Sequence, residues 1–232
     1  MKTIGLLGGM SWESTTSYYQ LINTGVNQAL GGLHSAKIVM YSVDFHEIEQ
    51  FQRQNQWAES AALLANAAKS VELAGADFVL LCTNTMHKVA AEIEQAISIP
   101  LLHIADATAE CLVKQGISKV GLLGTRFTME QDFYKGRLTE RFGIEVIVPS
   151  APERDLVHSV IYEELCLGRI CESSRAQYIE IINTLHQAGA QAVILGCTEI
   201  GLLVSQKDVE VPLYDTTKIH ATAAVVKAIS AG

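Results

Sequence analysis

The sequence of 232 residues has no long hydrophobic run and no cluster of basic residues. A membrane-spanning helix needs roughly 18 consecutive apolar residues, and no run approaches that length. The net charge is −8 and the 17 Lys and Arg residues are dispersed, whereas nucleic-acid-binding domains carry clustered positive charge. We therefore expect a soluble globular protein that binds neither nucleic acid nor a membrane.

Motifs for metals and nucleotide cofactors are also missing. The pair His46-Glu47 has no second His at metal-ligand spacing, and the seven His residues are scattered along the chain. No dinucleotide fingerprint, no phosphate loop with its Lys and no Gly-x-Ser-x-Gly motif occurs. The sequence therefore predicts a site that works with no cofactor and no metal.

Five cysteines are present, an odd number that does not favour a disulfide framework. A strand is expected within the first few residues, so we expect no signal peptide. We predict a cytoplasmic protein whose thiols are reduced. The cysteines are Cys82, Cys111, Cys166, Cys171 and Cys197.

The chain repeats itself. Ala74-Gly-Ala-Asp-Phe-Val-Leu-Leu-Cys-Thr-Asn-Thr85 returns as Ala188-Gly-Ala-Gln-Ala-Val-Ile-Leu-Gly-Cys-Thr-Glu199, at an offset of 188 − 74 = 114. Ile4-Gly-Leu-Leu-Gly8 returns at Val120 (120 − 4 = 116), and Ile99-Pro-Leu returns at Val211 (211 − 99 = 112). Three echoes in the same order indicate a duplicated unit.

Each copy alternates apolar strands with helices, which is typical of parallel α/β sheets. We predict two similar α/β domains, residues 1–103 and 104–213, with a C-terminal helix in 214–232 that packs back on the first. In the first copy, strands are expected at 3–7, 37–43, 78–81 and 99–104, and residues 44–56 read as a polar segment.

The repeat register makes Cys197 the twin of Thr83, and Gly196 the twin of Cys82. Ligands of parallel sheets bind beyond the carboxyl ends of the strands. If the copies face each other about a pseudo-two-fold axis, Thr83 and Cys197 lie on opposite walls of one cleft. A helix beginning after each strand would favour a carboxylate and lower a thiol pKa. The other residues expected to line this cleft are Met10, Asn84, Thr85, Thr125 and Thr198.

Less specific interpretations compete for some of these residues. A Cys after an apolar strand is most often a small buried hydrophobe, and Cys82 can point away from the cleft because strand side chains alternate. His87 lies one helical turn after Thr83 and could reach the cleft, although a hydrogen-bonded helix residue is the simpler reading. Cys111, Cys166 and Cys171 lie within or beside helices and are read as structural.

Two strands, one ending in Asn84-Thr85 and the other in Gly196-Cys197-Thr198, resemble the aspartate/glutamate racemase family. The resemblance spans the whole chain, and Gly8-Gly9-Met10 with Glu199 resembles its aspartate-racemase branch. It implies two α/β domains and cofactor-independent racemisation by two opposed cysteines, one removing the α-proton and the other delivering a proton to the opposite face. It also implies that Gln52 and Glu199 lie at the substrate.

The sequence departs from that family at one position, because Thr83 stands where the first catalytic Cys is expected and Cys82 lies one residue earlier. We therefore predict a homodimeric racemase of acidic amino acids in which Cys197 is the base for the L-enantiomer and Thr83 faces the other side. Cys82 or His87 could replace the missing thiol. The alternatives are a single-Cys decarboxylase of the same superfamily and an amino-acid binding or sensing protein.

Overall fold

The computed structural model describes residues 1–230. The chain divides into two compact units. Unit 1 comprises Met1–Ile104 and the chain from His220 on, and unit 2 comprises Ala105–Ile219. Each unit is described by itself.

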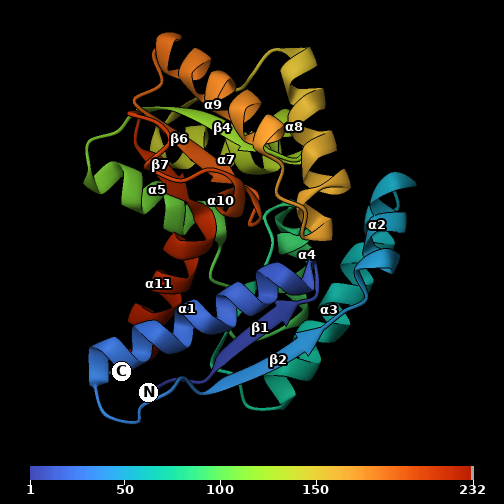
Figure 1. Ribbon diagram of the computed structural model, residues 1–232. Coiled ribbons are helices and arrows are strands. Elements are labelled where there is room, and N and C mark those ends of the chain that lie inside the picture. The colour runs from blue at the N-terminus through green and yellow to red at the C-terminus, as the bar shows by residue number, and fades with distance from the viewer. Residues whose placement is uncertain (231–232) are drawn as a thin grey trace. The chain divides into compact units, whose positions relative to one another are not determined.

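Unit 1 is built on a parallel three-stranded sheet of order β2–β1–β3, with α1 and α3 running beside it (Figure 1). Its elements are β1 (Ile4–Gly8), α1 (Trp12–Leu30), β2 (Ile38–Ser42), α2 (Phe45–Arg53), α3 (Trp57–Leu73), β3 (Phe78–Leu81), the 3-10 helix η1 (Thr85–Val89), α4 (Ala90–Ala96) and, from His220 on, α11 (Thr216–Ile229).

Side chains of β1 and β3 alternate between two hydrophobic clusters, one on each face of the sheet. Ile4, Leu6 and Leu80 pack against α1 and α11. Leu7 and Leu81 pack against α3 on the opposite face. Because the strands are buried on both faces, they read in the sequence as continuous apolar runs.

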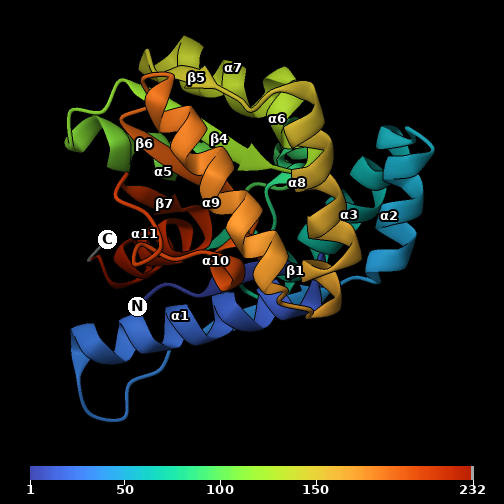
Figure 2. The ribbon, with the colours of Figure 1, turned by 45° about the horizontal axis from the view of Figure 1, so that its top comes forward.

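Unit 2 is built on a parallel four-stranded sheet of order β5–β4–β6–β7, and α8 and α9 run over one face of it (Figure 2). Its elements are α5 (Ile104–Lys114, whose first residue belongs to unit 1), β4 (Lys119–Gly124), α6 (Arg126–Glu130), α7 (Asp132–Phe142), β5 (Glu145–Ile147), α8 (Ala151–Glu163), the 3-10 helix η2 (Leu165–Leu167), α9 (Glu172–Gln187), β6 (Ala192–Gly196), α10 (Ile200–Leu203) and β7 (Leu213–Asp215).

The prediction of α/β units with parallel sheets is confirmed, and two local predictions are wrong. The strand expected at 99–104 is reduced to one bridge between Val79 and Leu101, because α5 already begins at Ile104. The polar segment 44–56 contains α2, whose first turn is capped by the Asp44 side chain accepting from the His46 N–H. Ile48 is the buried apolar residue of this short helix, so its helical period was too weak to detect.

The chain passes between the units at residues 104/105 and 219/220. The sequence placed these boundaries at 103/104 and 213/214. The second lies later in the structure because β7 pairs with β6, Tyr214 opposite Ile194, and so belongs to the sheet of unit 2. Residues 231 and 232 of the predicted C-terminal segment lie outside the described residues.

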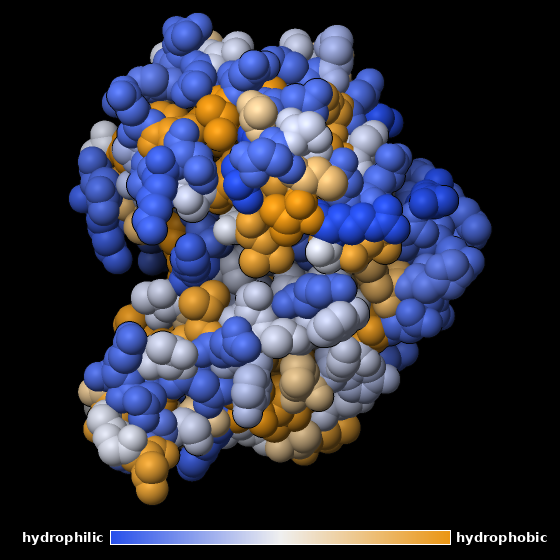
Figure 3. Space-filling view, viewed as in Figure 1, coloured by the Kyte–Doolittle hydropathy of each residue, from blue (hydrophilic) through white to orange (hydrophobic). Residues whose placement is uncertain are grey.

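The face drawn in Figure 3 shows many hydrophilic residues and several separate hydrophobic patches. Met40 and Tyr41 are exposed on β2, which lies at the edge of its sheet. None of the helices within residues 1–230 is both long enough and apolar enough to cross a membrane.

His220 joins three segments inside unit 1. Its Nε2 donates to the Leu102 carbonyl at 2.8 Å, and its Nδ1 accepts from the Tyr18 hydroxyl at 2.8 Å. The Leu102 carbonyl can only accept, so Nε2 carries a proton, and the lowered pKa leaves Nδ1 without one at neutral pH. Burial lowers the pKa of His220 to about 4.

This histidine makes unit 1 sensitive to acid. The unfolded chain binds a proton near pH 6.5 and the folded chain only near pH 4, so stability is complete above 6.5 and falls as the pH drops towards 4. The loss attributable to His220 is up to about 3 kcal/mol. Urea unfolding followed by the fluorescence of Trp12 and Trp57, both in unit 1, measures it. His220→Gln should flatten the pH dependence, and an unchanged slope would show that His220 is not the titrating group.

Candidate active site

The ladder registers of the two units place Thr83 and Cys197 at equivalent positions. Ile4 pairs with Phe78 in unit 1, and Val120 pairs with Ala192 in unit 2. The offsets are 120 − 4 = 116 and 192 − 78 = 114, the same as those of the sequence repeat. Thr83, two positions past the end of β3, therefore corresponds to Cys197, which directly follows β6.

The two cysteines next to these positions have different surroundings. Cys82 continues the alternation of Phe78 and Leu80 into the cluster beneath α1 and α11 and is fully buried. Burial raises the pKa of the Cys82 thiol far above its usual value, so it does not ionise at neutral pH. Its counterpart is Gly196, where a Cβ would lie 2.8 Å from the Leu123 carbonyl oxygen. Only glycine fits there, so the thiol of unit 2 comes one residue later.

At the end of β1, the chain turns through Gly9. Gly9 has φ +92°, and a Cβ there would lie 2.2 Å from the Val43 carbonyl oxygen. Its N–H donates to the Thr15 hydroxyl at 2.8 Å, which fixes the turn into α1. The adjacent Met10 packs in the hydrophobic cluster on the α3 side. Met10 is thus buried at this strand end, and its side chain lies among core residues.

Helix α2 brings Gln52 to the segment that follows Thr83. Gln52 is buried, and its Nε2 donates to the Met86 Sδ at 3.0 Å. Asn84 and Thr85 are buried at the start of η1. Unit 1 therefore brings together four of the residues predicted for the site, Gln52, Thr83, Asn84 and Thr85, although the helix carrying Gln52 was not predicted.

His87 is also buried and hydrogen-bonded to the main chain. Its Nδ1 lies 2.8 Å from the Thr83 carbonyl oxygen, and its Nε2 accepts from the Ile104 N–H at 3.2 Å. The Thr83 carbonyl can only accept and the Ile104 N–H can only donate, so the ring is neutral with its proton on Nδ1. Because both ring nitrogens bind the main chain, His87 does not provide a free base at this strand end.

In unit 2, the Cys197 thiol donates to the Glu199 Oε2 at 3.0 Å. The Thr198 hydroxyl donates to the same oxygen at 2.6 Å, and Glu199 is 2% exposed. Cys197 itself is partly exposed. Glu199 therefore holds the thiol and the neighbouring hydroxyl together, a contact that the Cys-Thr-Glu order alone did not reveal.

The expected lowering of the Cys197 pKa is wrong. Although part of the residue is exposed, desolvation of its sulfur raises the pKa of this thiol well above its usual value, and the Glu199 carboxylate raises it further. Helix α10 begins only at Ile200 and spans four residues, so it offers little positive field at Cys197. The resting group is a thiol, and ionising it becomes easier as the pH rises.

Thr125 lies beside Cys197 within unit 2, because Gly124 pairs with Gly196. Thr125 caps α6, its hydroxyl accepting from the Thr128 N–H at 3.3 Å. It is buried, and its hydroxyl also lies 3.2 Å from the Thr128 hydroxyl. Thr125, Cys197, Thr198 and Glu199 thus meet at the carboxyl ends of β4 and β6.

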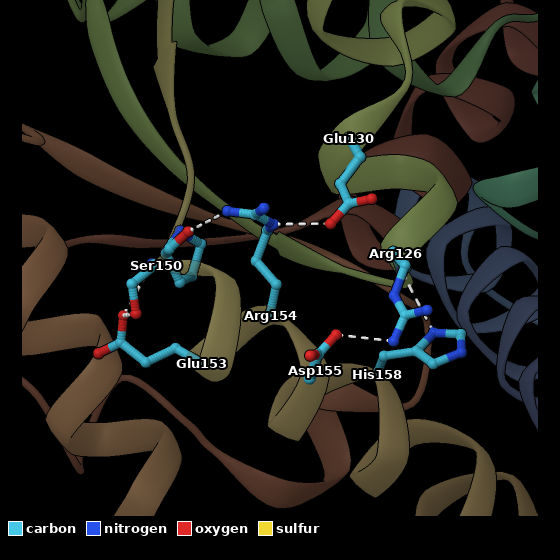
Figure 4. Close-up of polar contacts among 8 residues, drawn as sticks. Arg126, Glu130, Ser150, Glu153, Arg154, Asp155 and His158 are labelled. Carbon is cyan, nitrogen blue, oxygen red and sulfur yellow. Dashed lines mark hydrogen bonds and ion pairs between the residues drawn. The ribbon is translucent and has the colours of Figure 1, made fainter.

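A group of charged residues on α6 and α8 lies next to Thr125 and was not predicted from the sequence (Figure 4). Arg126 pairs with Asp155 at 2.7 Å, and its N–H donates to the His158 Nδ1 at 3.2 Å. Burial, and then Arg126, lowers the pKa of His158. Arg154 pairs with Glu130 in the same group. The only sequence signal was that Arg126 follows a predicted strand-end residue.

Among residues 1–230, no group of three or more His, Cys, Asp or Glu side chains is arranged to hold a metal ion. Cys111, Cys166 and Cys171 form no disulfide, and Cys166 packs against the same hydrophobic cluster as Cys197.

The chain is similar to known racemases along most of its length. The Asp/Glu/hydantoin racemase family model matches residues 7–224. A Yersinia pestis protein assigned as an Asp/Glu racemase is 60% identical with a TM-score of 0.93, over 99% of this chain and 100% of that one. An aspartate racemase homologue from Pyrococcus horikoshii is 35% identical with a TM-score of 0.85, over 99% and 100%. RacX of Bacillus subtilis, a broad specificity amino-acid racemase, is 24% identical over 96% of each chain.

The Glu199 contact predicts how Cys197 reacts. In Glu199→Gln the negative charge is lost, so the thiol pKa moves down towards its usual value and alkylation of Cys197 by iodoacetamide becomes several-fold faster at pH 8. Peptide mass spectrometry follows Cys197 apart from the other thiols. Thr198→Val is the matched control, since it removes a hydroxyl from the same oxygen and keeps the charge. Equal alkylation rates in the native protein and Glu199→Gln would contradict the assigned cause.

Proposed function

This chain belongs to the Asp/Glu/hydantoin racemase family and is an amino-acid racemase, and we propose that it racemises aspartate and glutamate with no cofactor or metal. The observation that carries the proposal is the equivalence of Cys197 and Thr83 in the two strand registers. A thiol and a hydroxyl at equivalent ends of duplicated sheets supply one proton-transfer group for each face of a substrate carbon.

The proposed reaction uses the two groups in sequence. The Cys197 thiol first loses its proton to water, and the thiolate then removes the α-proton of the L-enantiomer and becomes a thiol again. The electron pair stays on Cα as a carbanion. The Thr83 hydroxyl then donates its proton to the opposite face, and water reprotonates the alkoxide. A carbanion at Cα is a stronger base than an alkoxide, so the donation is downhill even though a hydroxyl is a weak acid.

The reverse direction is disfavoured because Thr83 would have to act as a base. A hydroxyl is a far weaker acid than a thiol, so the Thr83 alkoxide forms far less readily than the Cys197 thiolate, even with the pKa of Cys197 raised. Cys82 does not supply a second thiol, because it is fully buried in the core of unit 1. At saturation the enzyme therefore turns over the L-enantiomer faster than the D-enantiomer. Because the equilibrium constant between enantiomers is one, kcat/KM for racemisation is the same in both directions.

Two observations support an acidic substrate. The side chains at the strand ends are polar, and several relatives are named for aspartate or glutamate. Hydroxyl and amide groups there can bind a carboxylate by hydrogen bonds. The residues proposed to line the substrate are Met10, Gln52, Asn84, Thr85, Thr125, Thr198 and Glu199. Comparing all common amino acids of both configurations for α-proton exchange tests this range, and exchange confined to neutral amino acids would contradict it.

We also propose that the protein is a cytoplasmic homodimer. The exposure of Met40 and Tyr41 on edge strand β2 favours association of two copies. Sedimentation velocity gives the assembly state directly, and a monomer at micromolar concentration would contradict the dimer. Fractionation of cells that express the native chain tests the compartment.

Cys197→Ser tests the base. Serine keeps the shape but is not ionised at neutral pH, so α-proton exchange of L-aspartate and L-glutamate in heavy water should fall by about 10²-fold or more. Cys111→Ser, also in unit 2, is the matched control and should retain exchange. Chelators and hydroxylamine should leave exchange intact, because no metal or carbonyl cofactor takes part. Near-native exchange in Cys197→Ser would remove Cys197 from the reaction, and release of carbon dioxide would indicate a decarboxylase.

Thr83→Cys tests the opposite face. A thiol at this position can ionise and act as a base, so exchange of the D-enantiomer should rise above that of the native protein. Thr83→Val removes the hydroxyl at nearly constant volume and should suppress formation of D-product from L-substrate. The assignment of Thr83 fails if D-side exchange is the same in the native protein, Thr83→Cys and Thr83→Val.

A further inference from the structure

The imidazole of His87 takes the place of a backbone hydrogen bond next to Thr83. In an α-helix, the Thr83 carbonyl would accept from the N–H of His87, four residues on. That N–H donates instead to the Asn84 carbonyl at 3.1 Å, which makes the segment a 3-10 helix. The Nδ1–H of the same residue reaches back to the Thr83 carbonyl at 2.8 Å. The main-chain position of Thr83 is therefore fixed by a side chain.

The other ring nitrogen ties this arrangement to the end of unit 1. His87 Nε2 accepts from the N–H of Ile104, the last residue before the chain enters unit 2. The ring of His103 packs against that of His87, with centroids 4.5 Å apart. Both histidines are buried, at 3% and 4% exposure. A buried ring with both nitrogens bonded and an aromatic neighbour has little freedom to move.

Unit 2 has no histidine at the position equivalent to His87. The repeat offset makes Gly201 the counterpart of His87 (87 + 114 = 201), and Asp215 the counterpart of His103 (103 + 112 = 215). The positions are neighbours in both units, since a Cβ on Gly201 would lie 2.8 Å from the Asp215 Oδ2. The Cys197 carbonyl accepts only a short-range bond from the Ile200 N–H, at 3.2 Å. The duplicated fold thus does not require an imidazole here.

We propose that His87 is a positioning residue for Thr83, holding its main chain so that the hydroxyl points at the substrate carbon. This inference rests on the proposed function of Thr83 as proton donor. The hydroxyl is a weak acid, so its proton transfer depends strongly on good alignment with the substrate carbon. Cys197, on the other face in the proposed reaction, can ionise. Misplacing a reacting group by about 1 Å costs about 10²-fold in rate, so a fixed carbonyl at Thr83 has a measurable effect.

Two amide variants separate the two hydrogen bonds of His87. In His87→Asn, the side-chain nitrogen lies near the place of Nδ1 and can still donate to the Thr83 carbonyl, but nothing reaches Ile104. In His87→Gln, the longer side chain can accept from the Ile104 N–H, but nothing donates to the Thr83 carbonyl. The two variants carry the same functional group and differ mainly in which contact they keep.

The readout is the partition of the carbanion formed from L-aspartate in heavy water. Protonation from the Cys197 side, once its thiol has exchanged with heavy water, returns deuterated L-substrate, and protonation from the Thr83 side gives deuterated D-product. The ratio of D-product to total exchange therefore measures protonation by Thr83 relative to protonation from the Cys197 side. The total exchange itself reports that the protein is folded and that Cys197 works.

We expect the ratio to stay close to native in His87→Asn and to fall by about tenfold to hundredfold in His87→Gln, with total exchange preserved in both. An equal ratio in the native protein and both variants would overturn the proposal. The proposal would also be overturned if both variants lost the product ratio and the total exchange together, because that result indicates a structural role or a direct catalytic one. No exchange in the native protein itself would instead contradict the proposed function.

Discussion

The alternation of side chains at the end of β3 decides which residue can take part in the chemistry. Phe78, Leu80 and Cys82 face the cluster under α1 and α11, while Leu81 faces the opposite core. A thiol at position 82 is therefore committed to the core, and moving it by one residue would turn it towards the strand end. The protein has Thr83 at that place, so in the proposed reaction one face of the substrate meets a hydroxyl. The proposed use of a thiol on one face and a hydroxyl on the other depends on this one-residue shift.

The two strand ends use different polar partners, although the sheets that carry them are alike. Cys197 is held by a buried carboxylate, which keeps the thiol protonated at rest and fixes the direction of Sγ. Thr83 is held through its carbonyl by the imidazole of His87. One partner tunes the acidity of the group that must ionise, and the other restricts the position of the group that cannot. The duplicated strand ends thus have unlike polar surroundings.

The sequence was sufficient for the architecture and for the equivalence of Thr83 and Cys197, because apolar strand runs and their repeat are local patterns. It missed α2, since a short helix with one buried apolar residue has almost no period. It also predicted the wrong direction for the Cys197 pKa, because the field of a four-residue helix and the burial of Glu199 depend on tertiary structure. The bonds of His87 could not be predicted either, as they join residues up to 17 positions apart.

The most direct test of the account is the rate of α-proton exchange in the native enzyme, measured separately for each enantiomer of aspartate and of glutamate in heavy water. One thiol and one hydroxyl on opposite faces predict fast exchange from the L-enantiomer and slow or undetectable exchange from the D-enantiomer. Equal rates from both enantiomers would show that a second ionisable base serves the other face, and would contradict the assignment of Thr83.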